Sequence, residues 1–302
     1  MEGSLLKKVT VGLQLVMYPI AKKVGFAPAP QASPAAAATG TAPPVGKRRG
    51  KAAGTAAADA HSQEMEAFYA KQKDGYDLFR EDLLPGRSCM INLLPIVKQS
   101  AEGTGKMVWV DIGGGTARNL EFFPLHTLRR FFRKIYIVDV SSSLLEIARA
   151  RVDAAGLSDI VTIVRQDITA VGAVDELCGA HQADLVTFSY SLSMIPKQSA
   201  ALETASLLLK PAGAGTLAVA DFFLRGGEYD NRLRGLLRAA RWLEMTAQRL
   251  WFAQDGVHLL NESTLALVEG KSAKVVDTRF RSGVPFLPFL RPYHAVMMVP
   301  SA

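Results

Sequence analysis

The chain has 302 residues, 49% of them hydrophobic, so it is long enough for one large domain with a substantial core and additional segments. Its net charge of +7 comes from one end, because residues 1–58 carry eight cations and one anion while residues 59–302 hold 27 of each sign. A neutral domain argues against nucleic acid as a partner. The two cysteines, Cys89 and Cys178, provide neither a disulfide framework nor a metal-ligand spacing.

The first segment, residues 1–26, contains a 12-residue apolar run from Val9 to Ile20 between two lysine pairs. A bilayer span needs about 20 residues, so this run is too short to cross one comfortably. Three interpretations stay open: an anchor at a membrane interface, a cleaved targeting segment, or a helix packed on the domain.

Residues 27–60 are mostly Ala, Pro, Gly, Ser and Thr, a composition that predicts a flexible linker. The basic cluster at residues 47–51 suits a nuclear signal, a contact with phosphate or anionic lipid, or simple solvation. Residues 61–302 then form one predicted domain. Apolar residues at helical spacing between His61 and Val97 indicate helices before the first strand, which either cover the core or close over a ligand.

A strand, a glycine loop and a helix are predicted from Val108 to Asn119. Asp111 lies at the carboxyl end of the strand, and Gly113, Gly114 and Gly115 allow the backbone to turn tightly against a ligand. A dinucleotide-binding loop needs Gly-x-Gly-x-x-Gly, which this spacing does not provide. The pattern Asp-x-Gly-Gly-Gly-Thr instead resembles the first motif of class I S-adenosylmethionine methyltransferases.

Predicted strands and helices alternate after this loop, which is typical of a parallel sheet. A helix begins at the apparent capping box Ser143-x-x-Glu146 and ends at Gly156. Further strands are expected at 134–140, 160–164, 183–190 and 216–223, a helix at 197–209, and a closing antiparallel pair at 274–280 and 294–299. The predicted fold is α/β: a Rossmann-like class I methyltransferase sheet, mostly parallel with a closing antiparallel strand, and helices on both faces.

The ends of these strands carry the candidate cofactor residues. Asp139 ends the second strand, 24 residues beyond Gly115, where an acid can accept hydrogen bonds from both ribose hydroxyls. In the class that the loop resembles, the residues after the third strand contact the adenine. The predicted S-adenosylmethionine site comprises Asp111, Gly113, Gly114, Gly115, Asp139, Asp167, Ile168 and Ser189.

An insertion before the closing strands predicts a cationic amphipathic helix. Its apolar residues, from Leu233 to Trp251, recur at 3.6-residue spacing with arginines on other faces. Such a helix suits either a membrane surface or the edge of the sheet with its arginines in water.

Five segments together resemble the methyltransferase module of betaine-lipid synthase: residues 76–87, 109–116, 184–196, 251–252 with 258–260, and 283–288. The resemblance implies that S-adenosylmethionine methylates the amine of diacylglycerylhomoserine three times at a membrane surface. It places the protein on the cytosolic face of a membrane, the endoplasmic reticulum in a eukaryote. Only the methylating module is visible, so a separate aminocarboxypropyl transferase chain is an expected partner. The family usually has glycine where this chain has Ala117, and the sequence does not indicate an oligomeric state.

The chemistry needs no dedicated base, because an α-amine with a pKa near 8 costs only about 1.4 kcal/mol to deprotonate at pH 7. Tyr190 is the candidate for orienting the acceptor nitrogen, and the candidate substrate-binding residues are Tyr76, Tyr190, Trp251 and His258. Two alternatives stay open: a methyltransferase for another acceptor, such as phosphatidylethanolamine, a quinone or a soluble amine, and a non-catalytic cofactor-binding scaffold.

Overall fold

A computed structural model describes residues 84–94, 107–224, 235–254, 256–269, 276–282 and 292–301. The proposed anchor at 1–26, the linker at 27–60, Tyr76 and the segment 283–288 lie outside these residues. Within the described part of the chain, no helix has the length and apolarity that a bilayer span requires.

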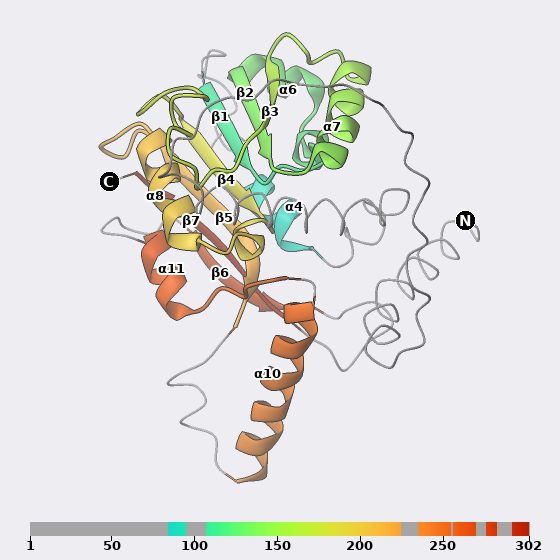
Figure 1. Ribbon diagram of the computed structural model, residues 1–302, viewed down its shortest axis with the longest axis vertical. Helices are drawn as coiled ribbons and strands as arrows, with labels where there is room; N and C mark the ends of the chain where they lie inside the picture. The colour runs from blue at the N-terminus through green and yellow to red at the C-terminus, as the bar shows by residue number, and fades with distance from the viewer. Residues whose placement is uncertain are drawn as a thin grey trace, which may run out of the picture.

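The centre of the fold is a seven-stranded sheet in the order β3-β2-β1-β4-β5-β7-β6 (Figure 1). The first five strands are parallel, whereas β7 is antiparallel to both β5 and β6. The strands are β1 Met107–Ile112, β2 Phe132–Asp139, β3 Val161–Arg165, β4 Leu185–Ser189, β5 Thr216–Phe223, β6 Val276–Arg281 and β7 Tyr293–Pro300. This arrangement confirms the predicted mostly parallel sheet with a closing antiparallel pair.

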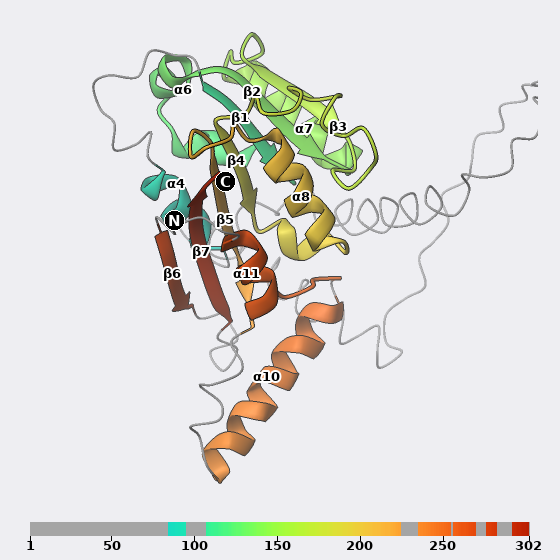
Figure 2. The same ribbon diagram turned by 90° about the vertical axis from the view of Figure 1, so that its left-hand side faces the viewer.

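Helices cover both faces of the sheet, as predicted. The helices are α4 Gly86–Leu93, η1 Arg118–Phe122, α6 Leu125–Phe131, α7 Ser142–Ala154, η2 Leu192–Met194, α8 Gln198–Leu208, α10 Leu236–Gln254 and α11 Glu262–Glu269. Helices α4, η1, α6 and α7 pack in one hydrophobic cluster, and α8 and α11 pack in the other (Figure 2). Successive residues of β2 pack into one cluster and then the other, because side chains alternate between the two faces of a strand.

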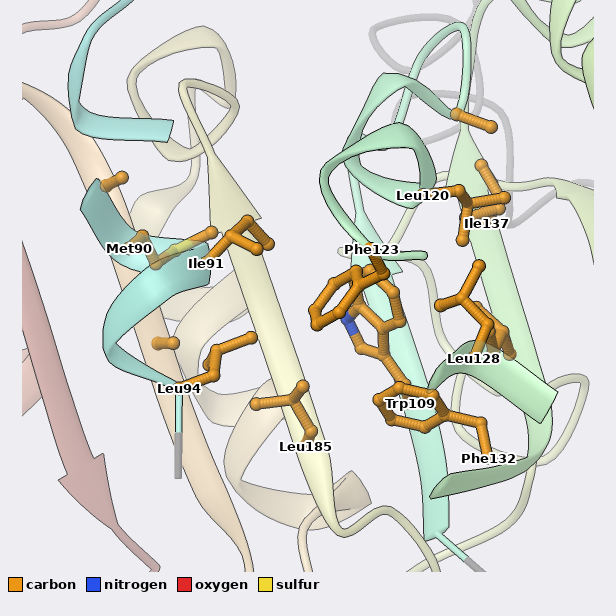
Figure 3. Packing of buried hydrophobic residues seen from close by; sticks show 14 of the residues in the cluster. Met90, Ile91, Leu94, Trp109, Leu120, Phe123, Leu128, Phe132, Ile137 and Leu185 are labelled. Atoms are coloured by element: carbon orange, nitrogen blue, oxygen red, sulfur yellow. The ribbon is translucent and has the colours of Figure 1, made fainter. Parts of the chain in front are cut away.

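Trp109 is the largest fully buried side chain and organises the first cluster (Figure 3). Its ring lies 5.3 Å from that of Phe132 and 5.8 Å from that of Phe123, measured between centroids. Its indole Nε1 donates a hydrogen bond of 2.8 Å to Thr187 Oγ1 on β4. The core therefore holds β1 and β4 in register just before the point where both strands end.

The helix predicted after the glycine loop is present as the short 3₁₀ helix η1. One local prediction was wrong. The cap of α7 is Ser141, whose Oγ accepts a hydrogen bond from the Leu144 N–H, and not Ser143. The predicted helix stop was confirmed, since Gly156 follows the last turn of α7 with φ +64°.

Candidate active site

The glycine loop is held by hydrogen bonds to the end of β2. The N–H groups of Gly113 and Gly114 donate to the carbonyl of Val138 at 2.7 and 3.1 Å. The Gly115 N–H donates to Asp139 Oδ2 at 3.0 Å, and the Ser141 N–H donates to Asp139 Oδ1 at 2.9 Å. The sheet therefore brings Asp139 and the glycine loop together, as the spacing of 24 residues predicts.

Asp111 is fully buried at the start of this loop and is enclosed by donors. Thr187 Oγ1 donates to its Oδ1 at 2.6 Å, and Asn119 Nδ2 lies 2.9 Å from Oδ2. Burial raises the pKa of Asp111 to about 6, although the hydrogen bonds from Thr187 and Asn119 act in the opposite direction. Asp111 therefore joins β1, β4 and η1 beneath the loop, and its side chain is a support rather than an exposed ligand.

Ala117 ends the loop with φ +59° and ψ +27°, the left-handed region that favours glycine. The loop keeps its shape there, because the Ala117 N–H donates to the Gly114 carbonyl at 2.9 Å. Arg151 of α7 braces the same turn through the Thr116 carbonyl and forms an ion pair with Glu121. Ala117 therefore adopts a left-handed conformation that costs a residue with a Cβ about 1–2 kcal/mol.

The segment after β4 closes the other side of the loop. Ser191 Oγ donates to the Ile112 carbonyl at 2.6 Å, and its Cβ leaves no room for a side chain at Gly113. The Ser193 N–H donates to Asp221 Oδ2 at 2.9 Å, and the His258 N–H donates to the Ser193 carbonyl at 2.6 Å. Residues 191–193 are therefore bonded to the ends of β1 and β5 and to the segment before α11.

The buried carboxyl of Asp221, which holds Ser193, should make the stability of the protein depend on pH. Burial raises its pKa to about 6 from an ordinary 3.8. The native state thus binds the proton more tightly than the unfolded state, so the stabilisation is complete below pH 4 and is lost as the pH rises through 6. From pH 4 to pH 7, we expect the wild type to lose up to about 3 kcal/mol of unfolding free energy relative to Asp221→Asn, which has no titrating group at this position.

Urea unfolding of both proteins at pH 4.5, 5.5 and 7.5 measures this difference. Asp111 titrates in both proteins and cancels from it. A difference that stays constant with pH would show that the Asp221 carboxyl titrates normally.

Tyr190 follows β4 in a left-handed conformation, with φ +56°, and its phenol is buried. Its Oη accepts a hydrogen bond from the Gly86 N–H at 2.8 Å and lies 2.8 Å from His294 Nδ1. Burial lowers the pKa of His294 to about 4 and raises that of the phenol, so both groups are neutral at pH 7. On the other side of the imidazole ring, His294 Nε2 is hydrogen-bonded to Ser282 Oγ, 2.6 Å away. This chain of hydrogen bonds fastens α4 to β4 and β7.

The other candidate residues lie around the same edge. The Asp167 side chain accepts hydrogen bonds from Thr169, while Ile168 is buried. Ser189 is also buried, and its Oγ has no hydrogen-bond partner within the described ranges, which fits a polar group of a ligand. Trp251 packs against the first hydrophobic cluster and His258 is exposed. None of these positions yet has a demonstrated ligand, so their roles stay predictions.

The sequence interpretation missed the supporting residues Asn119, Thr187 and Asp221. Each is polar and fully buried or nearly so, and each bonds to a group that shapes the loop. Thr187 is 76 residues from Asp111, so no local spacing could have indicated the contact. The one available signal was a polar residue within an otherwise apolar strand, as at Thr187 and Asp221.

Comparison with known proteins agrees with the methyltransferase class that the glycine loop predicts. A family model described as a methyltransferase domain matches residues 91–268, more than half of the chain. No curated protein matches at the sequence level.

Three solved structures each have a TM-score of 0.50. YcgJ from Bacillus subtilis is 9% identical, with 72% of this chain and 98% of that chain covered. Phosphoethanolamine N-methyltransferase 2 from Haemonchus contortus, in complex with phosphomonomethylethanolamine and S-adenosylhomocysteine, is 11% identical, with 78% and 60% covered. Geranyl diphosphate methyltransferase in complex with S-adenosylmethionine is 13% identical, with 76% and 92% covered. At these identities the likeness establishes the fold.

Proposed function

Because this chain belongs to the methyltransferase domain family and uses S-adenosylmethionine, we propose that its acceptor is the amine of diacylglycerylhomoserine. Three successive methyl transfers would form diacylglyceryl-trimethylhomoserine. A separate aminocarboxypropyl transferase chain would supply the homoserine lipid. The protein would act on the cytosolic face of a membrane, the endoplasmic reticulum in a eukaryote.

One observation carries the proposal: segments that resemble the betaine-lipid module meet at one edge of the sheet. Ser191 bonds to Ile112 at the end of β1, and Ser193 bonds to His258. These contacts join three of the resembling segments, 109–116, 184–196 and 258–260, although they lie far apart in the chain. Segments that resemble the module separately in the sequence thus lie together beside the glycine loop.

Aromatic rings also pack around Phe222, near the carboxyl end of β5. The Phe222 ring centroid lies 4.9 Å from that of Tyr190, 4.6 Å from that of Phe252 and 5.3 Å from that of His294. Aromatic faces attract quaternary ammonium groups, and methylation turns the acceptor amine into such a group. This cluster supports an amine as the acceptor, with Tyr190 at the boundary between the cofactor loop and the rings.

S-adenosylmethionine would supply the methyl group in each transfer. The ammonium would first release a proton to water, and the neutral nitrogen would then take the methyl carbon as its bond to sulfur breaks and S-adenosylhomocysteine leaves. We assign the ribose hydroxyls to Asp139 and a polar cofactor atom to Ser189 Oγ. The backbone of Gly113 to Gly115 would lie against the methionine portion, and the loop at Asp167 and Ile168 would meet the adenine. Positioning can supply up to roughly 7–11 kcal/mol in favourable cases, so the chain need not provide a general base.

The test uses purified protein in mixed micelles with methyl-labelled S-adenosylmethionine. Diacylglycerylhomoserine and phosphatidylethanolamine are offered in parallel, and mass spectrometry counts added methyl groups. Stepwise gain of one, two and three methyls on the homoserine lipid alone is the expected result, with Asp139→Ala as the inactive control. Transfer to phosphatidylethanolamine, or to neither lipid despite measurable cofactor binding, would refute the proposed acceptor.

A further inference from the structure

Helix α10 turns large apolar side chains away from the protein. Nine such side chains are exposed among the described residues, and five of them belong to this helix: Leu236, Leu237, Trp242, Leu243 and Leu250. Leu236 is 90% exposed and Trp242 is 64% exposed. A surface helix of a globular protein normally buries its apolar stripe, so the outward face of α10 is suited to a contact outside the described structure.

In the middle of α10, polar side chains face the protein instead. Arg241 and Gln248 are buried, and Glu244 forms ion pairs with Arg241 and with Arg281 of β6. The guanidinium carbons of Arg241 and Arg281 lie 4.9 and 4.7 Å from the ring centroid of Tyr293 on β7. These contacts fix which side of α10 faces the sheet, and the leucines are left outside as a consequence.

The charge of the outward face is positive. Glu244 is the only acid in the helix, and it is directed toward β6 and β7. Arg238 and Arg249 are exposed, and neither forms an ion pair within the described residues. A stripe of exposed leucines flanked by a tryptophan and arginines is the combination that binds at the interface of an anionic bilayer.

The position of α10 relates this face to the candidate active site. Figures 1 and 2 both show the helix beyond the edge at which the parallel strands end, the edge that carries the glycine loop. Near its carboxyl end, Phe252 joins the aromatic cluster through Phe222. A membrane bound to the outward face of α10 would therefore lie next to the candidate active site, where a lipid headgroup would have to enter.

We propose that the outward face of α10 docks this protein on an anionic lipid surface, with Leu236, Trp242, Leu243 and Leu250 in the interface and Arg238 and Arg249 at the headgroups. The functional role of this docking rests on the proposed lipid acceptor, but binding to lipid vesicles can be measured without that acceptor. A second copy of this chain is a poorer occupant, because two such faces would bring arginines together with no exposed acid on the helix to offset them.

The first experiment is co-sedimentation of the full chain, without substrate, with vesicles of phosphatidylcholine alone or with about 30% phosphatidylglycerol. Both Leu243→Gln/Leu250→Gln and Arg238→Gln/Arg249→Gln are expected to weaken binding to the anionic vesicles at least about tenfold. The matched controls change exposed residues outside α10, Leu207→Gln/Leu267→Gln and Arg149→Gln/Lys197→Gln, and should bind as the wild type does.

Brominated phosphatidylcholine locates the contact, since it quenches tryptophan that enters the acyl region. Quenching in the wild type is expected to disappear in Trp242→Phe, because Trp109 is fully buried and Trp251 is partly buried. Vesicle binding without Trp242 quenching would assign the membrane contact to another segment and overturn the proposal. A wild-type dimer that the leucine substitutions dissociate, with no effect on vesicle binding, would overturn it in favour of a second copy.

Failure of this proposal is separable from failure of the proposed function. If α10 docks on lipid, the leucine variant should keep its cofactor affinity and its methylation rate in detergent micelles and lose rate on anionic vesicles only. If the acceptor is wrong, neither protein will methylate the homoserine lipid, yet the vesicle and quenching results will still stand. Equal vesicle binding by wild type and the leucine variant contradicts the docking surface alone.

Discussion

Asp139→Ala is expected to weaken binding of S-adenosylhomocysteine by about 100-fold or more, measured by isothermal titration calorimetry. The carboxylate ends β2 beside the glycine loop and is the acid that we assign to the two ribose hydroxyls. A hydrogen bond to a charged group contributes about 1.5–3 kcal/mol, so losing two costs roughly 3 kcal/mol or more. Each 1.4 kcal/mol corresponds to a factor of ten in affinity.

The variant Asp139→Asn separates the role of Asp139 in cofactor binding from its role in holding the glycine loop. Asp139 accepts hydrogen bonds from both Gly115 and Ser141, and the amide retains one acceptor oxygen but loses the charge. We expect Asn to bind cofactor nearly as poorly as Ala while unfolding closer to the wild type. Asp175→Ala removes an exposed acid from the loop after β3 and serves as the control. Unchanged affinity in Asp139→Ala would place the ribose elsewhere.

The parallel part of the sheet was predictable because its strands are short, mostly apolar runs, and the first two end before Gly113 and at Asp139. The fifth strand has the predicted bounds, 216–223, and the others shift by one or a few residues. The loop geometry was also predictable in outline, since three consecutive glycines permit few other roles. Local sequence thus determined the edge of the sheet at which Asp139 and the loop would meet.

The details that failed depend on contacts distant in sequence. Three adjacent serines, residues 141–143, could each cap α7, and Ser141 is selected because its N–H also bonds to Asp139. The left-handed turn at Ala117 could not be predicted from an alanine, because tertiary bonds hold it there. Polar supports such as Thr187 and Asp221 become meaningful only when the strands are side by side.

The orientation of helix α10 also could not be predicted from local sequence. Its 3.6-residue period correctly predicted an amphipathic helix, but a period does not show which face meets the protein. The bonds of Glu244 with Arg241 and Arg281 decide that question, and Arg281 lies 37 residues away. The sequence therefore identified the helix and its two faces, while the structure assigned the apolar face to the outside.

The close packing of Gly113 against Ser191 can be tested by a single methyl group. Gly113 has φ +67°, and a Cβ there would lie 2.3 Å from the Cβ of Ser191, with its Oγ at 2.9 Å. Left-handed backbone costs alanine about 1–2 kcal/mol, and overpacking typically adds about 1–3 kcal/mol. We expect Gly113→Ala to lower the free energy of unfolding by roughly 2–5 kcal/mol and to weaken S-adenosylhomocysteine binding by more than about tenfold.

Gly213→Ala is the matched control, because Gly213 has φ +77° with no atom within 4 Å of an added Cβ. It carries the same backbone strain without the collision, so we expect a loss of only about 1–2 kcal/mol in urea unfolding and unchanged cofactor affinity. The excess loss in Gly113→Ala then measures the contact with Ser191. Shortening Ser191 in the double variant Gly113→Ala/Ser191→Gly should restore part of that excess, because the colliding Cβ is gone. Equal losses in the two single alanine variants would show that the loop moves freely away from β4, and that Ser191 does not fix the shape of the cofactor site.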